Sequence, residues 1–323
     1  MRLLVFIALF LFRLVVAAQK IEVSSLNGHN VTISSICISS DNKYFASSSL
    51  DGMVILWDMQ NQAEIKEYDN LSNTVTSLKF SHNTKYLAVA ADNLIKILSV
   101  PGGQIINVLK GHNATVTSID FSIDDAYILS GSLDKTARVW DINSGLPLKS
   151  VSHSKKITCV GFSHDNNYFA TGSDDKSVKI WFLNSGLLYK ELRRYSSPIW
   201  SLAFSNDSKY LISTCGDENK FANETYLWNV QDGRLLRTYS GQKDVVNTCA
   251  FSSDSRYVFS GSWDKTICIW SLNSDIPIHT IVTESPVTSI ALSPTDHFLI
   301  SGENNNLIKI WQNPLQNLKD TIH

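Results

Sequence analysis

The chain has 323 residues, of which 43% are hydrophobic and 18% are charged. A chain of this length can bury the cores of one or two domains, and its low charge content excludes a coiled coil. Basic residues number 28 and acidic residues 30, so the net charge is −2, without the basic excess that nucleic-acid-binding proteins carry. We therefore expect no nucleic acid as a partner.

Residues 1–18 predict a secretory signal peptide. Arg2 supplies a positive charge, Leu3 to Phe12 form an uncharged apolar run, and Val16-Ala17-Ala18 offers small residues for cleavage before Gln19. An uncleaved membrane anchor is the first alternative, although a spanning helix needs about 20 apolar residues and Arg13 interrupts this run. A wrongly assigned gene start, or an incidental apolar tail, is the second. Removal of residues 1–18 would leave 26 basic and 30 acidic residues, a net charge of −4.

The cysteines favour a different compartment. Their number is odd, and none shows the C-x-x-C spacing of zinc or redox sites. We expect most of them on buried strands that are too far apart to pair: Cys37, Cys159, Cys215, Cys249 and Cys268. Reduced cysteines are typical of the cytoplasm or nucleus, whereas residues 1–18 favour the secretory pathway or a membrane, so the sequence leaves the localisation open.

After residue 20 the chain is a tandem repeat. Six tryptophans and one leucine follow one another at intervals of 41, 42, 41, 47, 42 and 41 residues: Trp57, Leu98, Trp140, Trp181, Trp228, Trp270 and Trp311. The text around them recurs, as in VTSIDFSIDDAYILSGSLDKTARVWDI from Val116 and VNTCAFSSDSRYVFSGSWDKTICIWSL from Val246. A fixed period of this length is the signature of a repeat protein.

Each repeat predicts a small antiparallel sheet. Short β-branched and aromatic runs such as Arg138-Val139-Trp140 alternate with turn signals such as those from Gly131 to Lys135. A lone sheet cannot bury both faces, so neighbouring repeats must stack. The predicted fold class is all-β, with seven four-stranded antiparallel sheets in a closed ring. We place the ring at residues 19–315 and a C-terminal tail at residues 316–323.

These motifs resemble the WD-repeat β-propeller family, in which each repeat has Gly-His near its start and Trp-Asp near its end. Gly28-His29 and Gly111-His112 match the first signature, and Trp57-Asp58 and Trp140-Asp141 match the second. The resemblance covers Ile21 to Trp311. It implies a seven-bladed propeller whose last blade is completed by the N-terminal strand, for which Lys20 to Ser25 is correctly placed.

The resemblance also implies a structural hydrogen-bond network within each blade, made by His, Ser or Thr, Asp and Trp. Three blades carry the full set at matching spacing: His29, Ser47, Asp51 and Trp57; His112, Ser130, Asp134 and Trp140; His153, Thr171, Asp175 and Trp181. Blade six keeps Ser260, Asp264 and Trp270, with Gln242 in place of His. Ser, His and Asp are also the residues of a hydrolase triad, but an enzyme needs one triad and this pattern recurs.

The remaining blades depart further from the pattern. Blade two has Asn70, Ala88 and Leu98 around Asp92; blade five has Tyr195 and an insertion from Glu218 to Thr225; blade seven has Thr283 and Asn305 with Trp311. We expect intact neighbours to hold these blades in the ring.

Family geometry implies a binding face at one mouth of the central channel. One ring there holds the residues that precede the turn Asp or its equivalent: Leu50, Ala91, Leu133, Asp174, Gly216, Trp263 and Asn304. A second ring holds Ser34, Thr76, Thr117, Thr158, Trp200, Asn247 and Thr288. Exposed aromatic residues that cluster on one face anchor protein interfaces. The predicted partner-binding residues are Trp200, Trp263, Pro198, Phe221, Leu50 and Leu133. The alternative is that the two indoles only fill space in their blades.

The predicted function is a non-enzymatic scaffold for protein–protein interactions, a monomeric propeller that presents a rigid face for assembly of a multiprotein complex. One alternative is a secreted or membrane-tethered recognition propeller, which would contact a membrane only through residues 1–18. The other is a propeller enzyme. Because the predicted channel mouth shows no carboxylate pair or His cluster, and the chain has no phosphate-binding Gly loop, we predict no catalytic, cofactor-binding or metal-ligating residues.

Overall fold

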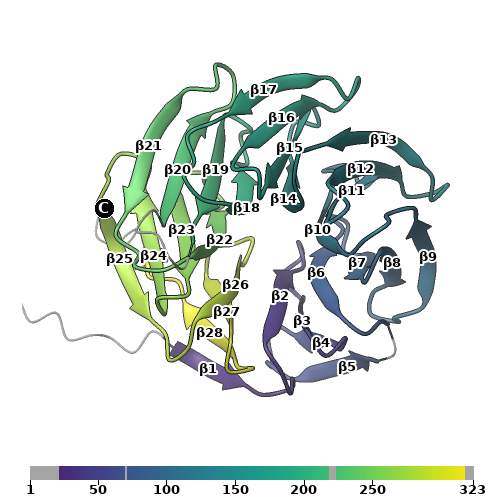
Figure 1. The fold of residues 1–323 in the computed structure, drawn as a ribbon. Coiled ribbons are helices and arrows are strands. Elements are labelled where there is room, and N and C mark those ends of the chain that lie inside the picture. Colours follow the sequence, from purple (N-terminus) through teal and green to yellow (C-terminus); the bar gives the residue numbers. More distant parts are fainter. Residues whose placement is uncertain (1–21, 70, 218–222, 317–323) are drawn as a thin grey trace, which may run out of the picture.

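Seven four-stranded antiparallel sheets stand around a common centre (Figure 1). This computed structural model describes residues 22–69, 71–217 and 223–316. The first strand of each blade lies at the centre of the ring and the last strand forms the rim (Figure 1). The predicted all-β, seven-bladed propeller is therefore confirmed.

The strands follow one plan in every blade. Blade one holds β2 (Ile33–Ile38), β3 (Tyr44–Ser49), β4 (Val54–Asp58) and β5 (Glu64–Tyr68). Blade two holds β6 (Val75–Phe80), β7 (Tyr86–Ala91), β8 (Leu94–Ser99) and β9 (Ile105–Lys110). Blade three holds β10 (Val116–Phe121), β11 (Tyr127–Ser132), β12 (Thr136–Asp141) and β13 (Pro147–Ser152). Blade four holds β14 (Ile157–Phe162), β15 (Tyr168–Ser173), β16 (Val178–Phe182) and β17 (Leu188–Leu192).

The remaining blades have the same order of strands. Blade five holds β18 (Ile199–Phe204), β19 (Tyr210–Cys215), β20 (Glu224–Asn229) and β21 (Leu235–Ser240). Blade six holds β22 (Val246–Phe251), β23 (Tyr257–Ser262), β24 (Thr266–Ser271) and β25 (Pro277–Val282). Blade seven holds β26 (Val287–Leu292), β27 (Phe298–Glu303), β28 (Ile308–Gln312) and, at the rim, β1 (Glu22–Leu26).

The ring is closed by pairing the two ends of the chain. Strand β1 runs antiparallel to β28, with Ser24 opposite Ile310 and Leu26 opposite Ile308, and the two strands lie side by side in Figure 1. This confirms the predicted closure by the N-terminal strand. Of the segment predicted for it, residues 20 and 21 lie outside the described residues.

A buried serine sets the turn between the first two strands of every blade. Its hydroxyl oxygen accepts the N–H of the first residue of the second strand, at 2.9–3.0 Å. The seven serines are Ser39, Ser81, Ser122, Ser163, Ser205, Ser252 and Ser293. A serine hydroxyl that bonds nearby backbone in this way favours a turn over a continued strand. The same short motif therefore produces the same hairpin seven times.

Hydroxyl groups also join neighbouring blades around the channel. A Ser or Thr on the first strand of one blade accepts a backbone N–H from the first strand of an adjacent blade, at 3.0–3.4 Å. The residues are Ser35, Ser77, Ser118, Ser201, Thr248 and Ser289. Blade four has Cys159 at the corresponding position. These bonds supplement apolar packing between the faces of the sheets.

The core consists of seven apolar clusters, most of which join the sheets of two adjacent blades. At the closing seam, for example, Ile33, Phe45 and Trp57 of blade one pack with Ile300 and Ile310 of blade seven. Fully burying one such side chain contributes about 1.5–3 kcal/mol. Blades two, five and seven therefore keep a buried interface with their neighbours although their polar networks differ.

The cysteines are all buried and lie on β2, β14, β19, β22 and β24. Burial raises the pKa of the Cys37 thiol to about 12, although the charge of Lys79 opposes the change. At neutral pH this thiol is therefore protonated and unreactive.

Both ends of the chain extend beyond the described residues. The predicted signal peptide or anchor at 1–18 lies outside them, as do residues 317–323 of the predicted tail. Leu315 is buried against blades six and seven, and the Gln316 side chain donates to the carbonyl of Asp296 at 2.9 Å. Within 22–69, 71–217 and 223–316, no helix has the length and apolar character needed to cross a membrane.

Candidate functional site

Blade three contains a continuous chain of buried hydrogen bonds. The Trp140 indole donates to the Ser130 hydroxyl oxygen at 2.8 Å, and Ser130 lies 2.7 Å from His112 Nε2. His112 Nδ1 lies 2.8 Å from the Asp134 carboxylate. The pattern fits a neutral imidazole in which Nδ1–H donates to Asp134 and Nε2 accepts the Ser130 proton. The four residues thus connect strands β11 and β12 to the loop that precedes β10 and to the turn that carries Asp134.

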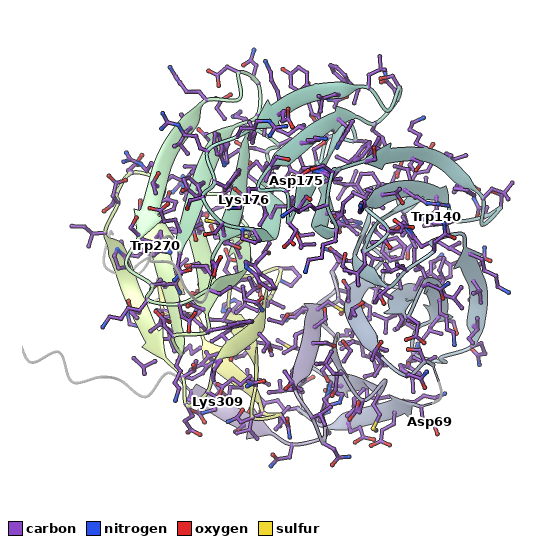
Figure 2. The ribbon with its side chains drawn as sticks, in the orientation of Figure 1. Asp69, Trp140, Asp175, Lys176, Trp270 and Lys309 are labelled. Atoms are coloured by element: carbon purple, nitrogen blue, oxygen red, sulfur yellow. The ribbon has the colours of Figure 1, made fainter. Side chains whose placement is uncertain are left out.

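Blade four repeats this arrangement with threonine. Trp181 donates to the Thr171 hydroxyl at 2.9 Å, Thr171 lies 2.7 Å from His153 Nε2, and His153 Nδ1 lies 3.0 Å from Asp175. The turn that carries Asp175 and Lys176 is labelled in Figure 2, where Trp140 and Trp270 stand on opposite sides of the ring. Ser130 and Thr171 are fully buried, so neither hydroxyl is placed to attack a substrate.

Electrostatics in these two blades favour a neutral imidazole and an ionised carboxylate. Burial lowers the pKa of His112 and His153, although their Asp partners oppose the change. Burial acts to raise the pKa of Asp134, but hydrogen bonds from Thr136, His112 and the backbone outweigh it and lower that pKa to about 2. Asp175 has a pKa of about 2 because Ser177 and His153 similarly outweigh its burial. Both networks are therefore fully formed at neutral pH.

Blade one contains only half of the network. Trp57 donates to Ser47 at 2.9 Å and His29 Nε2 lies 2.8 Å from Ser47. However, His29 Nδ1 and one Asp51 oxygen are buried without a hydrogen-bond partner among the described residues. Blade one has Met53 where blades three, four and six have a hydroxyl residue that donates to the turn Asp at 2.6 Å, so this position offers Asp51 and His29 no hydroxyl partner.

Other residues replace the missing histidine in blades five and six. The Tyr195 hydroxyl lies 2.6 Å from Ser213, which also accepts the Trp228 indole N–H at 3.1 Å. In blade six, Ser260 donates to the Gln242 side chain and accepts from Trp270, both at 2.8 Å. Gln242 does not bond Asp264 directly; its side-chain N–H donates to the Thr266 hydroxyl at 3.2 Å, and that hydroxyl donates to Asp264 at 2.6 Å. Asp264 also accepts the Lys243 and Thr266 backbone N–H groups, at 2.6 and 3.0 Å. The insertion predicted from Glu218 to Thr225 is shorter than expected, because β20 begins at Glu224; residues 218–222 are outside the described residues.

Blades two and seven are the most altered. Ala88 and Leu98 of blade two are fully buried and pack as apolar residues, and Asn70 lies outside the described residues. In blade seven, Trp311 donates to Ser301 at 2.8 Å, a serine that the sequence analysis did not single out. Thr283 bonds the Ser285 carbonyl instead of entering the network.

Blade seven also contains a buried carboxylate that the repeat pattern did not reveal. Glu303 is fully buried, and neither of its carboxylate oxygens has a hydrogen-bond partner among the described residues. Burial raises its pKa to about 7, against the opposing charge of Lys309. Lys309, labelled in Figure 2, is itself buried and pairs with Glu284 at 3.0 Å and Glu22 at 3.4 Å. Sequence could have indicated this site, because four other blades have serine where blade seven has Glu303.

At the predicted binding mouth, hydroxyl groups from the ring of small residues form hydrogen bonds within the propeller. Thr117, Thr158 and Thr288 each donate to the carbonyl of the residue 14 positions later, at 3.0–3.1 Å. Trp200 occupies the same position in blade five, and its longer side chain donates to the Gly216 carbonyl at 3.0 Å. The polar atom of this indole is therefore satisfied within the molecule.

Trp200 and Trp263 form an aromatic pair across blades five and six. Their ring centroids are 5.7 Å apart and the planes are tilted by 54°. Both side chains are half-buried, as is Pro198, whose carbonyl accepts the Gly216 N–H at 3.3 Å. We call Trp200 and Trp263 the indole pair. Its geometry lies within the range in which aromatic rings attract each other.

The other predicted contact residues are not part of this pair. Leu50 and Leu133 are exposed, at 48% and 41%, in the turns of blades one and three that correspond to the turn of Trp263. Phe221 lies outside the described residues. Within the described residues, no group of three or more His, Cys, Asp and Glu side chains is arranged to hold a metal ion.

Comparison with known proteins places this architecture in a family. The profile described as WD domain, G-beta repeat matches residues 20–58, 64–99, 103–141, 145–181, 186–220, 233–271 and 276–312. The chain is 34% identical over 242 residues to small ribosomal subunit protein RACK1 of Caenorhabditis elegans, which covers 74% of this chain and 73% of that protein. It is 27% identical over 258 residues to the U3 small nucleolar RNA-associated protein 15 homolog of Xenopus tropicalis, 79% of this chain and 49% of that protein.

A third relative shows how much longer some matched proteins are. The U3 small nucleolar RNA-associated protein 21 homolog of Schizosaccharomyces pombe is 32% identical over 130 residues, which are 40% of this chain and 14% of that protein. The chain thus spans less than half the length of this relative and of the Xenopus protein. There is one profile match for each of the seven blades, shifted so that it begins with the outer strand of the preceding blade, and we conclude that the chain belongs to the WD40 family of repeat proteins.

Proposed function

We propose that this protein is a non-enzymatic scaffold that binds other proteins at the channel mouth, with the indole pair as the anchor. The main support for the proposal is the packing and hydrogen bonding of the Trp200 and Trp263 side chains. Both are half-buried and packed on each other, and the Trp200 N–H is already bonded within the propeller. The polar group of Trp200 is thus satisfied internally, which leaves its ring face as an apolar surface packed on Trp263, as in the aromatic residues that dominate binding energy at protein interfaces.

Rigidity of the surrounding blades supports this function. The mouth consists of strand ends and turns, and the hydrogen-bond networks of blades three, four and six fix the turns to the strands. A preorganised surface loses little conformational entropy on binding. Leu50 and Leu133 project from other blades at the same mouth, so a partner that covers the channel would contact them as well as the indole pair.

Relatives whose names denote components of larger assemblies are consistent with this proposal. RACK1 of Caenorhabditis elegans is named a small ribosomal subunit protein, and a Dictyostelium discoideum relative is named Elongator complex protein 2. By analogy, this chain would act as a monomeric propeller within a multiprotein complex. The secreted or membrane-tethered alternative rests on residues 1–18 alone, and neither the fold nor these relatives favour it.

Affinity capture tests the proposal. Tagged wild type and the double variant Trp200→Ala/Trp263→Ala are used as bait, and captured proteins are quantified by mass spectrometry. We expect a defined set of partners to fall by about tenfold or more with the double variant, because truncation of anchor residues costs about 2 kcal/mol or more.

A matched control removes two exposed apolar side chains from the rim. Leu187 and Leu188 are 68% and 47% exposed, and Leu187→Ala/Leu188→Ala should leave the captured set unchanged. Thermal unfolding of both double variants is measured in parallel. If the indole pair only fills space, its removal lowers the unfolding temperature and the partner set is lost only in step with folded protein. Equal capture by wild type and the indole variant would refute the proposal.

A further inference from the structure

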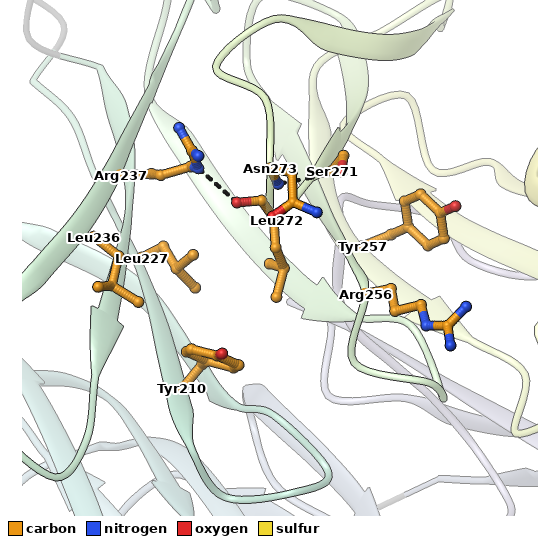
Figure 3. Close-up of a pocket in the computed structure, with 9 residues that line it drawn as sticks. All are labelled: Tyr210, Leu227, Leu236, Arg237, Arg256, Tyr257, Ser271, Leu272 and Asn273. Atoms are coloured by element: carbon orange, nitrogen blue, oxygen red, sulfur yellow. Dashed lines mark hydrogen bonds between the residues drawn. The ribbon is translucent and has the colours of Figure 1, made fainter.

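A second candidate site lies between blades five and six, away from the channel mouth. It is a groove of about 490 Å³ (Figure 3). We call it the blade five–six groove and define it by Tyr210, Leu227, Leu236, Arg237, Arg256 and Leu272. In Figure 3, Tyr210, Leu227 and Leu236 form one side, and Leu272 and Arg256 stand on the other.

The groove lies at the opposite end of the strands from the indole pair. Tyr210 is the first residue of β19, whereas the Gly216 carbonyl that Trp200 bonds follows the last residue of that strand. Tyr257 likewise begins β23 and Trp263 follows its end. A six-residue strand is about 20 Å long. The two candidate sites are therefore on opposite faces of the same two blades.

The chemistry of the groove is apolar inside and basic at its edge. Leu227 is buried, and Leu236 and Leu272 are half-buried, so they supply an apolar surface with room for a side chain. Arg237 is fixed by donating from Nε to the Leu272 carbonyl at 2.5 Å, and from Nη1 to Asp275 at 2.8 Å. Arg256 is exposed and forms no ion pair with a described residue. No acidic residue lines the groove.

The corresponding groove between blades three and four has a mixed lining, in which Lys149 is accompanied by an acidic residue. Its leucines, Leu148 and Leu183, occupy the same positions, but its volume is about 260 Å³ and Asp124 lies in its lining. Asn167 stands where blade six has Arg256, and its side chain donates to Asp165 at 2.7 Å. Across residues 22–316, five of the six arginines fall between residues 193 and 256. The unpaired guanidinium is thus a feature of this groove and not of the repeat.

We propose that the blade five–six groove binds an acidic peptide segment of a partner protein. A Phe or Leu side chain of the peptide packs on Leu227, Leu236 and Leu272, and a neighbouring carboxylate pairs with Arg256. Arginine suits this task because its planar guanidinium binds carboxylates with two parallel hydrogen bonds. This site goes beyond the proposed function and does not depend on the indole pair.

Fluorescence anisotropy with a synthetic probe tests the inference on the full chain. The probe is a fluorescein-labelled decapeptide in which Phe-Leu is flanked on both sides by Asp and Glu. We expect saturable binding that weakens as salt is added, because the ion pair is at the surface. Arg256→Glu should weaken binding by about tenfold or more, since it removes a charge-assisted hydrogen bond and adds repulsion.

Three controls show whether binding depends on this groove, on the charge of the peptide or on the channel mouth. Lys149→Glu makes the same charge change in the blade three–four groove and should alter affinity by less than about twofold. A probe with Asn and Gln in place of Asp and Glu should bind about tenfold more weakly. Trp200→Ala/Trp263→Ala should bind the probe like wild type, which separates this site from the channel mouth.

The inference is overturned if wild type shows no saturation up to about 1 mM probe. It is also overturned if Arg256→Glu and Lys149→Glu weaken binding equally, because that result would show a general charge effect. The last experiment tests a single-stranded RNA oligonucleotide as the probe. If RNA binds in a way that requires Arg256 and the peptide does not bind, the ligand of the groove is a nucleic acid and the inference is wrong. Circular dichroism confirms that the exposed Arg256 variant is folded.

Discussion

Replacing Glu303 by glutamine should remove a pH dependence from the stability of the propeller. Glu303 is buried beside Lys309, whose ammonium group already pairs with Glu284 and Glu22. Burial raises the pKa of Glu303 from its ordinary 4.5 to about 7, so the folded protein holds this proton more tightly than the unfolded chain does. The resulting stability is fully present below pH 4.5 and is lost as the pH rises through about 7.

The size of the effect follows from that difference. A pKa of about 7 instead of 4.5 corresponds to at most about 3 kcal/mol in the absence of solvent screening. The Glu284 side chain of the same cluster is 71% exposed, so water reaches its edge, and we expect about 1–2 kcal/mol. Glu303→Gln keeps the shape of the side chain without the charge. It should therefore be more stable than wild type by this amount at pH 8, and the difference should fall to roughly a quarter of that amount at pH 5.

Urea unfolding at intervals of pH from 5 to 8 measures the difference directly. Groups that titrate equally in both proteins, including His112 and His153, cancel when the variant is compared with wild type. Glu303→Ser is a second variant, because serine at this position in blades one, three, four and six donates to a loop carbonyl at 2.8–3.0 Å. Parallel stability curves for wild type and Glu303→Gln across this range would refute the reasoning.

Three further substitutions test the blade networks and one turn. Met53→Thr should raise the unfolding temperature, because a hydroxyl there gives the unpaired His29 nitrogen a partner, worth about 0.5–1.5 kcal/mol; no gain in a thermal melt would contradict this account. Ser130→Ala should lower the free energy of unfolding in urea by about 1–3 kcal/mol, because it leaves the buried Trp140 N–H unpaired. Ser130→Thr should retain most of the wild-type stability, because blade four uses threonine at this position. Equal losses in both variants would count against the network. Gly52→Ala should destabilise by more than about 1 kcal/mol, because φ is +84° and a Cβ atom would lie 2.2 Å from a carbonyl oxygen; an unchanged melting temperature would show that the turn relaxes.

The repeat period made most of the fold predictable. Each strand and turn is specified locally and seven times over, so an ambiguous segment such as the one around Leu98 is placed by its neighbours. The turn serines show why: Ser122 or Ser293 bonds a residue only five positions away, which makes the hairpin independent of the rest of the chain. Closure by the N-terminal strand came from the family resemblance, because no local feature of Lys20 to Ser25 pairs it with β28.

Prediction was weaker wherever a blade departs from the consensus. The family resemblance and the spacing placed His29 and Asp51 in a network, but the two side chains are not bonded, and Met53 lies at a position that the spacing rule does not examine. Glu303 was overlooked because the spacing rule covers only the His, Ser or Thr, Asp and Trp positions; a comparison of the last residue of each second strand, which is serine in four other blades, would have revealed it. The blade five–six groove combines side chains that lie up to 62 residues apart, Tyr210 and Leu272, and only the packing of two sheets brings them together.

The seam between β1 and β28 constrains how this protein is made. Leu26 and Ile308 are partners in the sheet although 282 residues separate them in the chain. Contacts so distant along the chain form late, because a very long loop must be closed before they contribute. During translation, blades one to six can assemble in order as they leave the ribosome, but the rim of blade seven stays unmatched until Gln312 has emerged. The N-terminal strand β1 therefore stays unpaired until all seven blades have been synthesised, and its pairing with β28 completes the ring.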